Sequence, residues 1–261
     1  MNWLDITPGS RWLFVFPHPD DELAVLAFLR RLRMLGAQVT SVWMHSTPFR
    51  KAESLRVLTK IGFPTKDLYF FEAPDGELCD QLDVYAPLLD DLIQAVQPDY
   101  VVTCAFEQGH LDHDATHFLV RRLAGSIPVL EFPLYYSYHA PKLQWMNQFS
   151  MFDADHYLPL DEHEIALKKR MARAYPSQNI WRTLCTYHVV CAILGRPARL
   201  AYRELLRPAA HYDYRQTVHQ GIRGWLVQRT RHWTRWVDAV NRYEVQKFAP
   251  TSAIQTTAVT E

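Results

Sequence analysis

The chain has 261 residues, and its 28 Lys and Arg balance its 28 Asp and Glu, so that the formal charge is zero. Hydrophobic residues make up 48% of the sequence, enough to fill the core of one large domain or of one domain with an extension. We expect neither a membrane span, which needs a run of ~18 apolar residues, nor a signal peptide, because the N-terminus lacks a basic segment followed by an apolar one.

Apolar strands and helices alternate along most of the chain. Strands are predicted at 11–17, 38–45, 67–71, 99–105 and 127–132. Helices are predicted at 21–35, 50–61, 80–96, 113–124 and 161–175. This order predicts an α/β fold, with a Rossmann-like, mostly parallel sheet flanked by helices. There is no GxGxxG loop after the first strand and no P-loop, which argues against a nucleotide-dependent enzyme.

The turn after the first predicted strand carries an unusual concentration of charge. Pro17-His18-Pro19-Asp20-Asp21-Glu22 follows an apolar run, and a helix is predicted to begin directly after it. Two adjacent carboxylates at a strand end are unfavourable unless a positive group binds there. His18 and Asp21 are three residues apart, so both can reach one divalent cation. One Asp could instead cap the helix, but a cap needs neither a second Asp nor a His.

A second set of polar residues follows the strand predicted at 99–105. Gly109-His110-Leu111-Asp112-His113 leads into the next helix. Parallel strands end at the same edge of a sheet, where open α/β proteins bind their ligands. One His can therefore complete a His/Asp/His metal site while the other serves the reaction. His117, one helical turn after His113, is the alternative ligand.

These two turns resemble the signatures of the LmbE-like, or PIG-L, N-acetylglucosaminyl deacetylases. The signatures are a Pro/Ala-His-Pro-Asp-Asp-Glu turn and a later His-x-Asp-His, and Leu111 stands where the family usually has proline. Weaker similarities are Arg50-x-x-Glu53, Pro74-Asp75-Gly76 and Tyr175-x-Ser-Gln. The resemblance implies a metal-dependent hydrolase that removes the N-acetyl group from an N-acetylated amino sugar or its conjugate.

Metal-dependent amide hydrolysis requires metal ligands and a general base, and the two turns can supply both. His18, Asp21 and His113 would hold the metal, and three protein ligands leave positions open for water and the carbonyl oxygen. Zn²⁺ is favoured, with Fe²⁺ and Co²⁺ as alternatives. Asp20 is not needed as a ligand and is assigned as the general base.

The remaining assignments concern the substrate. The resemblance implies that His110 faces the substrate and stabilises the oxyanion or protonates the leaving amine. Asp112 would orient His110, or would only cap the helix. Arg50 and Asp75 are predicted to contact the sugar, although a solvated helix start and a simple turn would explain them as well. A structural role is predicted for Glu22.

Other functional classes remain as alternatives. The same residues would suit an amidase that cleaves a larger acyl group from a sugar conjugate. A non-catalytic metal- or sugar-binding module would not need Asp20 and His110. The partner is predicted to be a small-molecule amino sugar or glycoconjugate. The four Cys include no CxxC pair, which is typical of a reduced, cytoplasmic protein.

The C-terminal part differs in composition from the rest. Residues 199–248 contain ten Arg or Lys and four Asp or Glu, and aromatic residues recur at helical spacing after Trp225. We predict an LmbE-like catalytic domain at 1–198, a basic, aromatic-rich helical extension packed on it at 199–248, and a disordered tail at 249–261. The alternative for the extension is peripheral contact with a membrane or a lipid-linked glycan. The overall neutrality argues against nucleic-acid binding.

Overall fold

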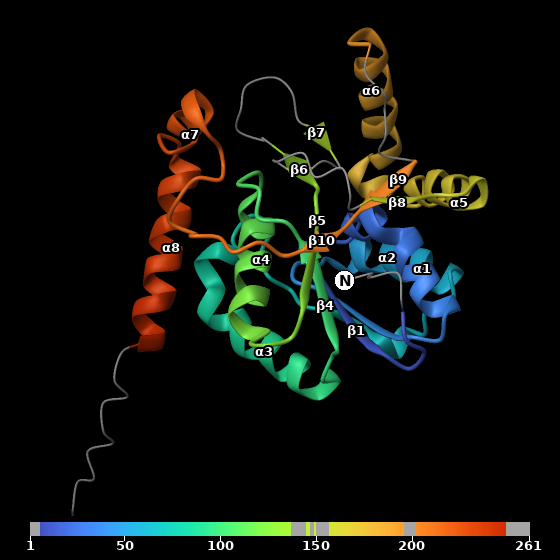
Figure 1. The fold of residues 1–261 in the computed structure, drawn as a ribbon, viewed down its shortest axis with the longest axis horizontal. Coiled ribbons are helices and arrows are strands. Elements are labelled where there is room, and N and C mark those ends of the chain that lie inside the picture. Colours follow the sequence, from blue (N-terminus) through green and yellow to red (C-terminus); the bar gives the residue numbers. More distant parts are fainter. Residues whose placement is uncertain (1–5, 137–144, 147–148, 150–156, 196–201, 249–261) are drawn as a thin grey trace, which may run out of the picture.

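The computed structural model describes residues 6–136, 145–146, 149, 157–195 and 202–248, and the predicted tail lies outside these residues. Its main sheet has six strands in the order β10-β5-β4-β1-β2-β3. The strands are β1 (Arg11–Phe16), β2 (Gln38–Trp43), β3 (Leu68–Phe70), β4 (Tyr100–Cys104), β5 (Val129–Phe132) and β10 (Arg207–Pro208). Strands β1 to β5 are parallel, and β10 pairs antiparallel with β5. The predicted α/β fold with a mostly parallel sheet is confirmed (Figure 1).

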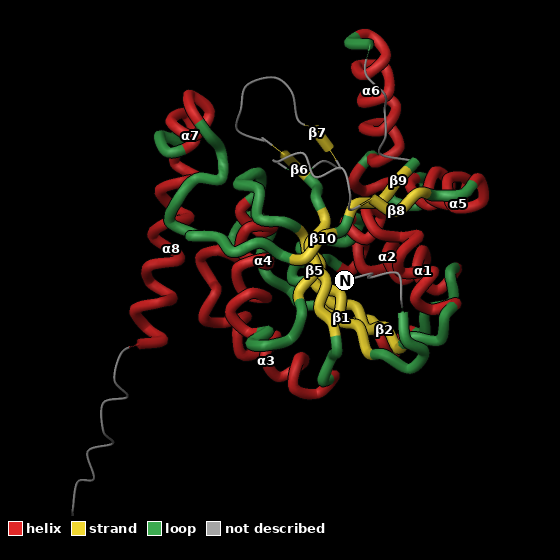
Figure 2. The backbone as a smooth tube through the Cα atoms, viewed as in Figure 1, coloured by secondary structure: helices red, strands yellow, loops and turns green. Residues whose placement is uncertain are grey.

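A helix follows each of the first four strands and returns the chain to the start of the next one. The eight described helices are α1 (Leu26–Met34), α2 (Pro48–Lys60), α3 (Leu82–Val96), α4 (Leu111–Leu123), α5 (Glu162–Ala172), α6 (Ile180–Ile193), α7 (Gly221–Val227) and α8 (Arg231–Phe248). Short 3₁₀ turns precede α1, β3, α3 and α6, at Asp21–Val25, Thr65–Asp67, Leu78–Gln81 and Pro176–Gln178 (Figure 2).

Two of the predicted helices differ in their boundaries. The helix predicted from residue 21 begins as a 3₁₀ turn, and α1 starts only at Leu26. The carboxylate of Glu204, from another part of the chain, accepts the backbone N–H groups of Ala27 and Phe28 and so caps this helix. In the extension, the helical part is divided into α7 and α8. The hydroxyl of Thr230, between them, accepts the backbone N–H of Trp233 and so caps α8.

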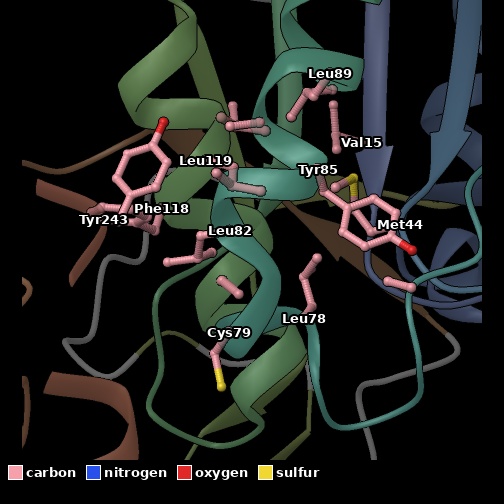
Figure 3. Packing of buried hydrophobic residues seen from close by; sticks show 14 of the residues in the cluster. Val15, Met44, Leu78, Cys79, Leu82, Tyr85, Leu89, Phe118, Leu119 and Tyr243 are labelled. Carbon is pink, nitrogen blue, oxygen red and sulfur yellow. The ribbon is translucent and has the colours of Figure 1, made fainter. Parts of the chain in front are cut away.

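The side chains of the central strand β1 alternate between two hydrophobic cores. Leu13 and Val15 pack against α3 and α4, whereas Trp12, Phe14 and Phe16 pack on the opposite face with α1. Figure 3 shows the first core, where Leu82 and Leu89 of α3 pack in one cluster with Leu119 of α4 and with residues of the sheet. Helix α8 extends this core on the outside, with Trp236 and Tyr243 buried in it and the ring of Tyr243 against Phe118.

A buried polar network, which we call the Glu131 network, joins the extension to the sheet. Glu131 of β5 accepts hydrogen bonds from Arg207 Nε at 2.6 Å and from the Tyr212 hydroxyl at 2.9 Å. Its other oxygen lies 3.1 Å from Nε2 of His117, whose Nδ1 lies 3.0 Å from the Tyr214 hydroxyl. The network therefore connects β5, α4, β10 and the segment before α7.

Two small sheets and an isolated helix complete the described structure. Strands β6 (Tyr135–Tyr136) and β7 (Trp145–Met146) form one sheet, and β8 (Tyr157–Pro159) and β9 (Arg203–Leu205) form the other. Helix α6, which the sequence did not predict, projects away from the main sheet (Figure 1). Among the described residues, no helix combines the length and the apolar character that crossing a bilayer would require.

Candidate active site

The turn after β1 holds Asp20 in a strained backbone conformation. Its φ of 116° is one that residues with a side chain rarely adopt. Glu22, which is fully buried, accepts the backbone N–H of Asp20 at 2.8 Å and the indole N–H of Trp43 at 3.1 Å. It also accepts the hydroxyl proton of Tyr175 at 2.6 Å. Glu22 is thus a support for the turn, as the sequence predicted.

Three ligand atoms converge beneath this turn. Nδ1 of His18 lies 3.2 Å from Nε2 of His113, and Oδ2 of Asp21 lies 3.6 Å from each of these nitrogens. A tetrahedral metal with ligands at about 2.0–2.1 Å requires ligand atoms roughly 3.3 Å apart. All three residues are buried. The structure therefore brings together His18, Asp21 and His113 at a spacing that suits one divalent ion.

Two other sets of side chains are also close enough to hold a cation. Ligand atoms of His18, His110 and His113 lie within 4.8 Å of one another, as do those of His18, Asp75, His110 and Asp112. The first of these sets replaces Asp21 by His110. We favour Asp21, because a carboxylate 3.6 Å from both nitrogens adds charge to the site, while His110 is occupied at Nδ1 by a backbone N–H.

Asp112 bonds to His18 rather than to His110, which corrects the sequence-based assignment. Its Oδ2 lies 2.9 Å from Nε2 of His18, and its two oxygens accept the backbone N–H groups of Gly76 and Leu78 at 2.7 and 3.0 Å. In the neutral imidazole, the ionised carboxylate holds the proton of His18 on Nε2, so that the Nδ1 lone pair is directed at the three-ligand cluster. Gly76, at a φ of 76°, allows the predicted Pro-Asp-Gly turn to make this contact.

The charges in this cluster shift the pKa values strongly. Burial alone would lower the pKa of His18, but its contacts with Asp112, Asp21 and Asp75 raise it well above the usual range. Burial lowers the pKa of His113 to about 3. Asp21 is buried too, yet the neighbouring His113 and His18 lower its pKa to about 2. Such shifts in one cluster are typical of functional sites.

Arg50 reaches across the cluster from α2. Its guanidinium donates to Asp20 Oδ1 at 3.3 Å and to the carbonyl of Pro19 at 3.2 Å, and it lies 3.6 Å from Asp75. Arg50 is buried, whereas 59% of the Asp75 side chain is exposed. Burial and the charge of Asp21 raise the pKa of Asp20 well above the usual range, against the opposing effect of Arg50.

Two further histidines border the cluster. His110 caps α4, and its Nδ1 accepts the backbone N–H of Asp112 at 3.2 Å. Neutral His110 therefore carries its proton on Nε2. His45 donates from Nδ1 to the carbonyl of Ala73 at 2.6 Å, and its ring lies 5.5 Å from that of His18. Burial lowers the pKa of both histidines.

The Tyr-x-Ser-Gln motif contacts residues near the cluster, and the sequence analysis did not predict these contacts. Glu53, which is fully buried, accepts the backbone N–H of Ser177 at 3.0 Å and its hydroxyl proton at 2.5 Å. Tyr175 binds Glu22 from the same segment. The Tyr-x-Ser-Gln motif thus supports α2 and the turn after β1. In the sequence, the motif itself is the only sign of this role.

The segment that holds this cluster is similar to a known protein family. Residues 13–124, which include both turns, match the family model PIG-L, described as GlcNAc-PI de-N-acetylase. This segment of the chain is therefore similar to the PIG-L family. The description of the family supports a deacetylase, and the match agrees with the resemblance seen in the two turns. No curated protein is similar to the chain in sequence.

Solved structures share the fold of this chain. A deacetylase from the biosynthesis pathway of teicoplanin has a TM-score of 0.58 at 18% identity, with 78% of this chain and 99% of that chain covered. The zinc-inhibited form of teicoplanin deacetylase Orf2 gives 0.55 at 17% identity, with the same coverage. The 4-carboxy-2-hydroxymuconate hydratase GalB from Pseudomonas putida KT2440 gives 0.51 at 14% identity, with 82% and 99% covered. The fold thus serves deacetylases and a hydratase, and function must be argued from the site.

Proposed function

We propose that this protein is a metal-dependent hydrolase that removes the N-acetyl group from an N-acetylated amino sugar or its conjugate. The observation that carries the proposal is the convergence of His18 Nδ1, Asp21 Oδ2 and His113 Nε2 within 3.6 Å of one another, directly beside Asp20. A metal-binding module alone has no need of a strained, largely buried carboxylic acid next to the ligands.

The donor set suits Zn²⁺, with Fe²⁺ or Co²⁺ as alternatives, because imidazole and carboxylate ligands bind all three. When bound, such an ion polarises the amide carbonyl and lowers the pKa of water toward ~7. His18, Asp21 and His113 would hold it. Teicoplanin deacetylase Orf2, which shares the fold, has a zinc-inhibited form, so the three metals are to be compared rather than assumed equivalent.

Asp20 is the proposed general base. Its carboxyl takes the proton of the attacking water, and the raised pKa brings it closer to the range in which a carboxylate transfers protons efficiently. Arg50, 3.3 Å from Oδ1, favours the ionised form and fixes the orientation of the carboxyl group. Glu22 holds the backbone of Asp20 in place through its N–H group.

His110 is the proposed oxyanion donor. With Nδ1 occupied by the N–H of Asp112, its Nε2 carries the proton that can be donated to the developing negative oxygen. The same proton can pass to the leaving nitrogen. Asp112 acts through His18 and is a positioning residue, because its carboxylate touches that imidazole and two loop N–H groups.

The exposed carboxylate of Asp75 is the proposed acceptor for sugar hydroxyls. It lies 3.4 Å from His18 and 3.6 Å from Arg50, so a sugar bound to it would be at the rim of the cluster. Such an arrangement of one acceptor and one multidentate donor suits a ring with vicinal hydroxyl groups.

The test is a screen of N-acetylated amino sugars, free, nucleotide-linked and lipid-linked, for release of acetate and free amine. Wild-type protein is loaded in parallel with Zn²⁺, Fe²⁺ or Co²⁺, and the His113→Ala protein serves as the control for contaminating hydrolases. We expect acetate release that needs added metal and is absent from the control. Release of a longer acid from N-acyl analogues alone would favour the amidase alternative. Metal binding without any turnover would contradict the proposal and favour the binding module.

A further inference from the structure

Two helices at one end of the molecule expose large apolar side chains that no other described part of the protein covers. At the tip of α6, Val189, Ile193 and Leu194 are exposed, and Ile193 is 78% accessible. On α7, Ile222 is 80% and Trp225 52% accessible. We call these five residues the apolar tips. Soluble surfaces rarely gather so many large apolar residues at projecting points unless a partner covers them.

Both tips project from the end of the molecule that carries the candidate site. The parallel strands end at the upper edge of the sheet in Figure 1, where β5 leads up to β6, and α6 and α7 rise on either side of that edge. The tip of α6 is its C-terminal end, farthest from the sheet (Figure 2). A flat partner that touches both tips would therefore face the edge where His18 lies.

The charge around α7 is of one sign. Residues 214–237 contain five Arg and no Asp or Glu, and α6 carries Arg182 near its start and no Asp or Glu. Just after α7, the guanidinium of Arg229 lies 3.7 Å from the ring centre of Trp225. Apolar residues with Trp and Arg beside them are typical of segments that enter the interface of an anionic bilayer.

We propose that the apolar tips of α6 and α7 dock this protein peripherally on an anionic membrane surface, with the candidate active site facing the lipid headgroups. A second copy of the chain is a poorer occupant, because pairing like surfaces would bring two basic regions together. The proposal stands on exposure and charge and does not depend on the deacetylase assignment. Helix α8 packs on the domain through Trp236 and takes no part in it.

The test is co-sedimentation of the full chain with phosphatidylcholine vesicles that contain or lack phosphatidylglycerol. We expect binding only to the anionic vesicles, and release when NaCl is raised. Ile193→Ser and Ile222→Ser should each weaken binding about threefold to tenfold, as expected for losing one partly inserted aliphatic side chain. Met34→Ser is the matched control, because Met34 is 68% exposed at the end of α1, where the chain turns back into β2 at the opposite edge of the sheet.

The side chains to be changed are exposed, so the variants should keep the fold, which circular dichroism would verify. Absence of wild-type binding to anionic vesicles would overturn the proposal. Equal loss in Met34→Ser would overturn it as well, because the effect would then not belong to the tips. Analytical ultracentrifugation identifies the other occupant: oligomers that Ile193→Ser and Ile222→Ser dissolve, without vesicle binding, would assign the tips to a second copy.

Discussion

Helix α4 carries two buried histidines one turn apart, and their surroundings differ. His117 has a partner at each nitrogen, Glu131 at Nε2 and the Tyr214 hydroxyl at Nδ1. Nε2 of His113 instead faces another imidazole nitrogen, Nδ1 of His18, at 3.2 Å, and the proton of His18 is held on Nε2 by Asp112. In the Glu131 network each donor meets an acceptor, whereas at His113 two ring nitrogens face each other, which requires a proton or a cation between them.

This difference separates a structural cluster from a candidate functional one. A buried network in which donors and acceptors match joins parts of the fold and needs nothing from outside. A cluster in which acceptors face one another is stable only with a proton or a cation between them. Residue types alone do not distinguish the two, since both contain histidine, carboxylate and arginine. The matching of donors to acceptors does.

The largest expected effect tests the open cluster directly. His18→Ala and His113→Ala should each lose the metal and all measurable turnover, because two ligands no longer form a closed site. His117→Ala should keep its metal and lose thermal stability instead. Elemental analysis of the purified proteins, with differential scanning calorimetry, checks both. Full metal occupancy in His18→Ala and His113→Ala would refute the proposed ligand set.

The second prediction separates metal binding from proton transfer. Asp20→Asn should keep the metal and lower turnover by about 10²–10⁴-fold, since it removes the proton acceptor and nearly preserves shape. His110→Ala should also keep the metal and lower turnover. Metal content and acetate release are measured on the same samples. Turnover of Asp20→Asn within a few-fold of wild type would make Asp20 a structural residue, and metal loss in His110→Ala would make His110 the ligand in place of Asp21.

The third prediction concerns the Glu131 network. Glu131→Gln should lower the free energy of unfolding by about 3 kcal/mol without loss of metal, because Arg207 is left buried without its counter-charge. Urea unfolding measures the change. Loss of metal in this variant, at unchanged stability, would mean that the network serves the site rather than the fold.

The same variant should change how stability depends on pH. Although burial opposes it, contacts with His117 and Arg207 lower the pKa of Glu131 below its usual value. A lowered folded-state pKa stabilises the protein above the unfolded value of about 4.3 and loses this contribution as the pH falls through the folded value. The stability difference between wild type and Glu131→Gln should therefore shrink on acidification. A difference that is constant from neutral pH to below about pH 4 would contradict this.

The smallest effect is expected at Asp112. Asp112→Asn should weaken metal affinity about 10–100-fold, because the amide no longer holds the proton on Nε2 of His18 as firmly. Asp114→Asn is the matched control on the same helix turn: burial raises the pKa of Asp114 to about 8, so that its carboxyl is largely neutral at pH 7. Competition with a metal-binding dye compares the two. An equal loss in both would point to disturbance of α4 rather than to His18.

Much of the architecture follows from local patterns. The strands at 11–17 and 99–105 are short apolar runs, each followed by a polar turn and a helix, and parallel strands must end at the same edge. That reasoning placed His18 and Asp21 near His113 although 95 residues separate the two histidines. The α6 helix was missed because it has no polar face pattern: nearly all of its residues are uncharged, and it packs on little.

The sequence by itself determined which residues gather at the edge of the sheet, because strand, turn and helix are set by neighbours along the chain. Only the tertiary structure decided which atoms meet there. Asp112 reaches His18 instead of the adjacent His110, and His117 is satisfied by Glu131 and a tyrosine from the extension. The physical reason is that hydrogen bonds act over about 3 Å. Sequence spacing can place two residues in one neighbourhood, but it cannot fix their side-chain contacts to that precision.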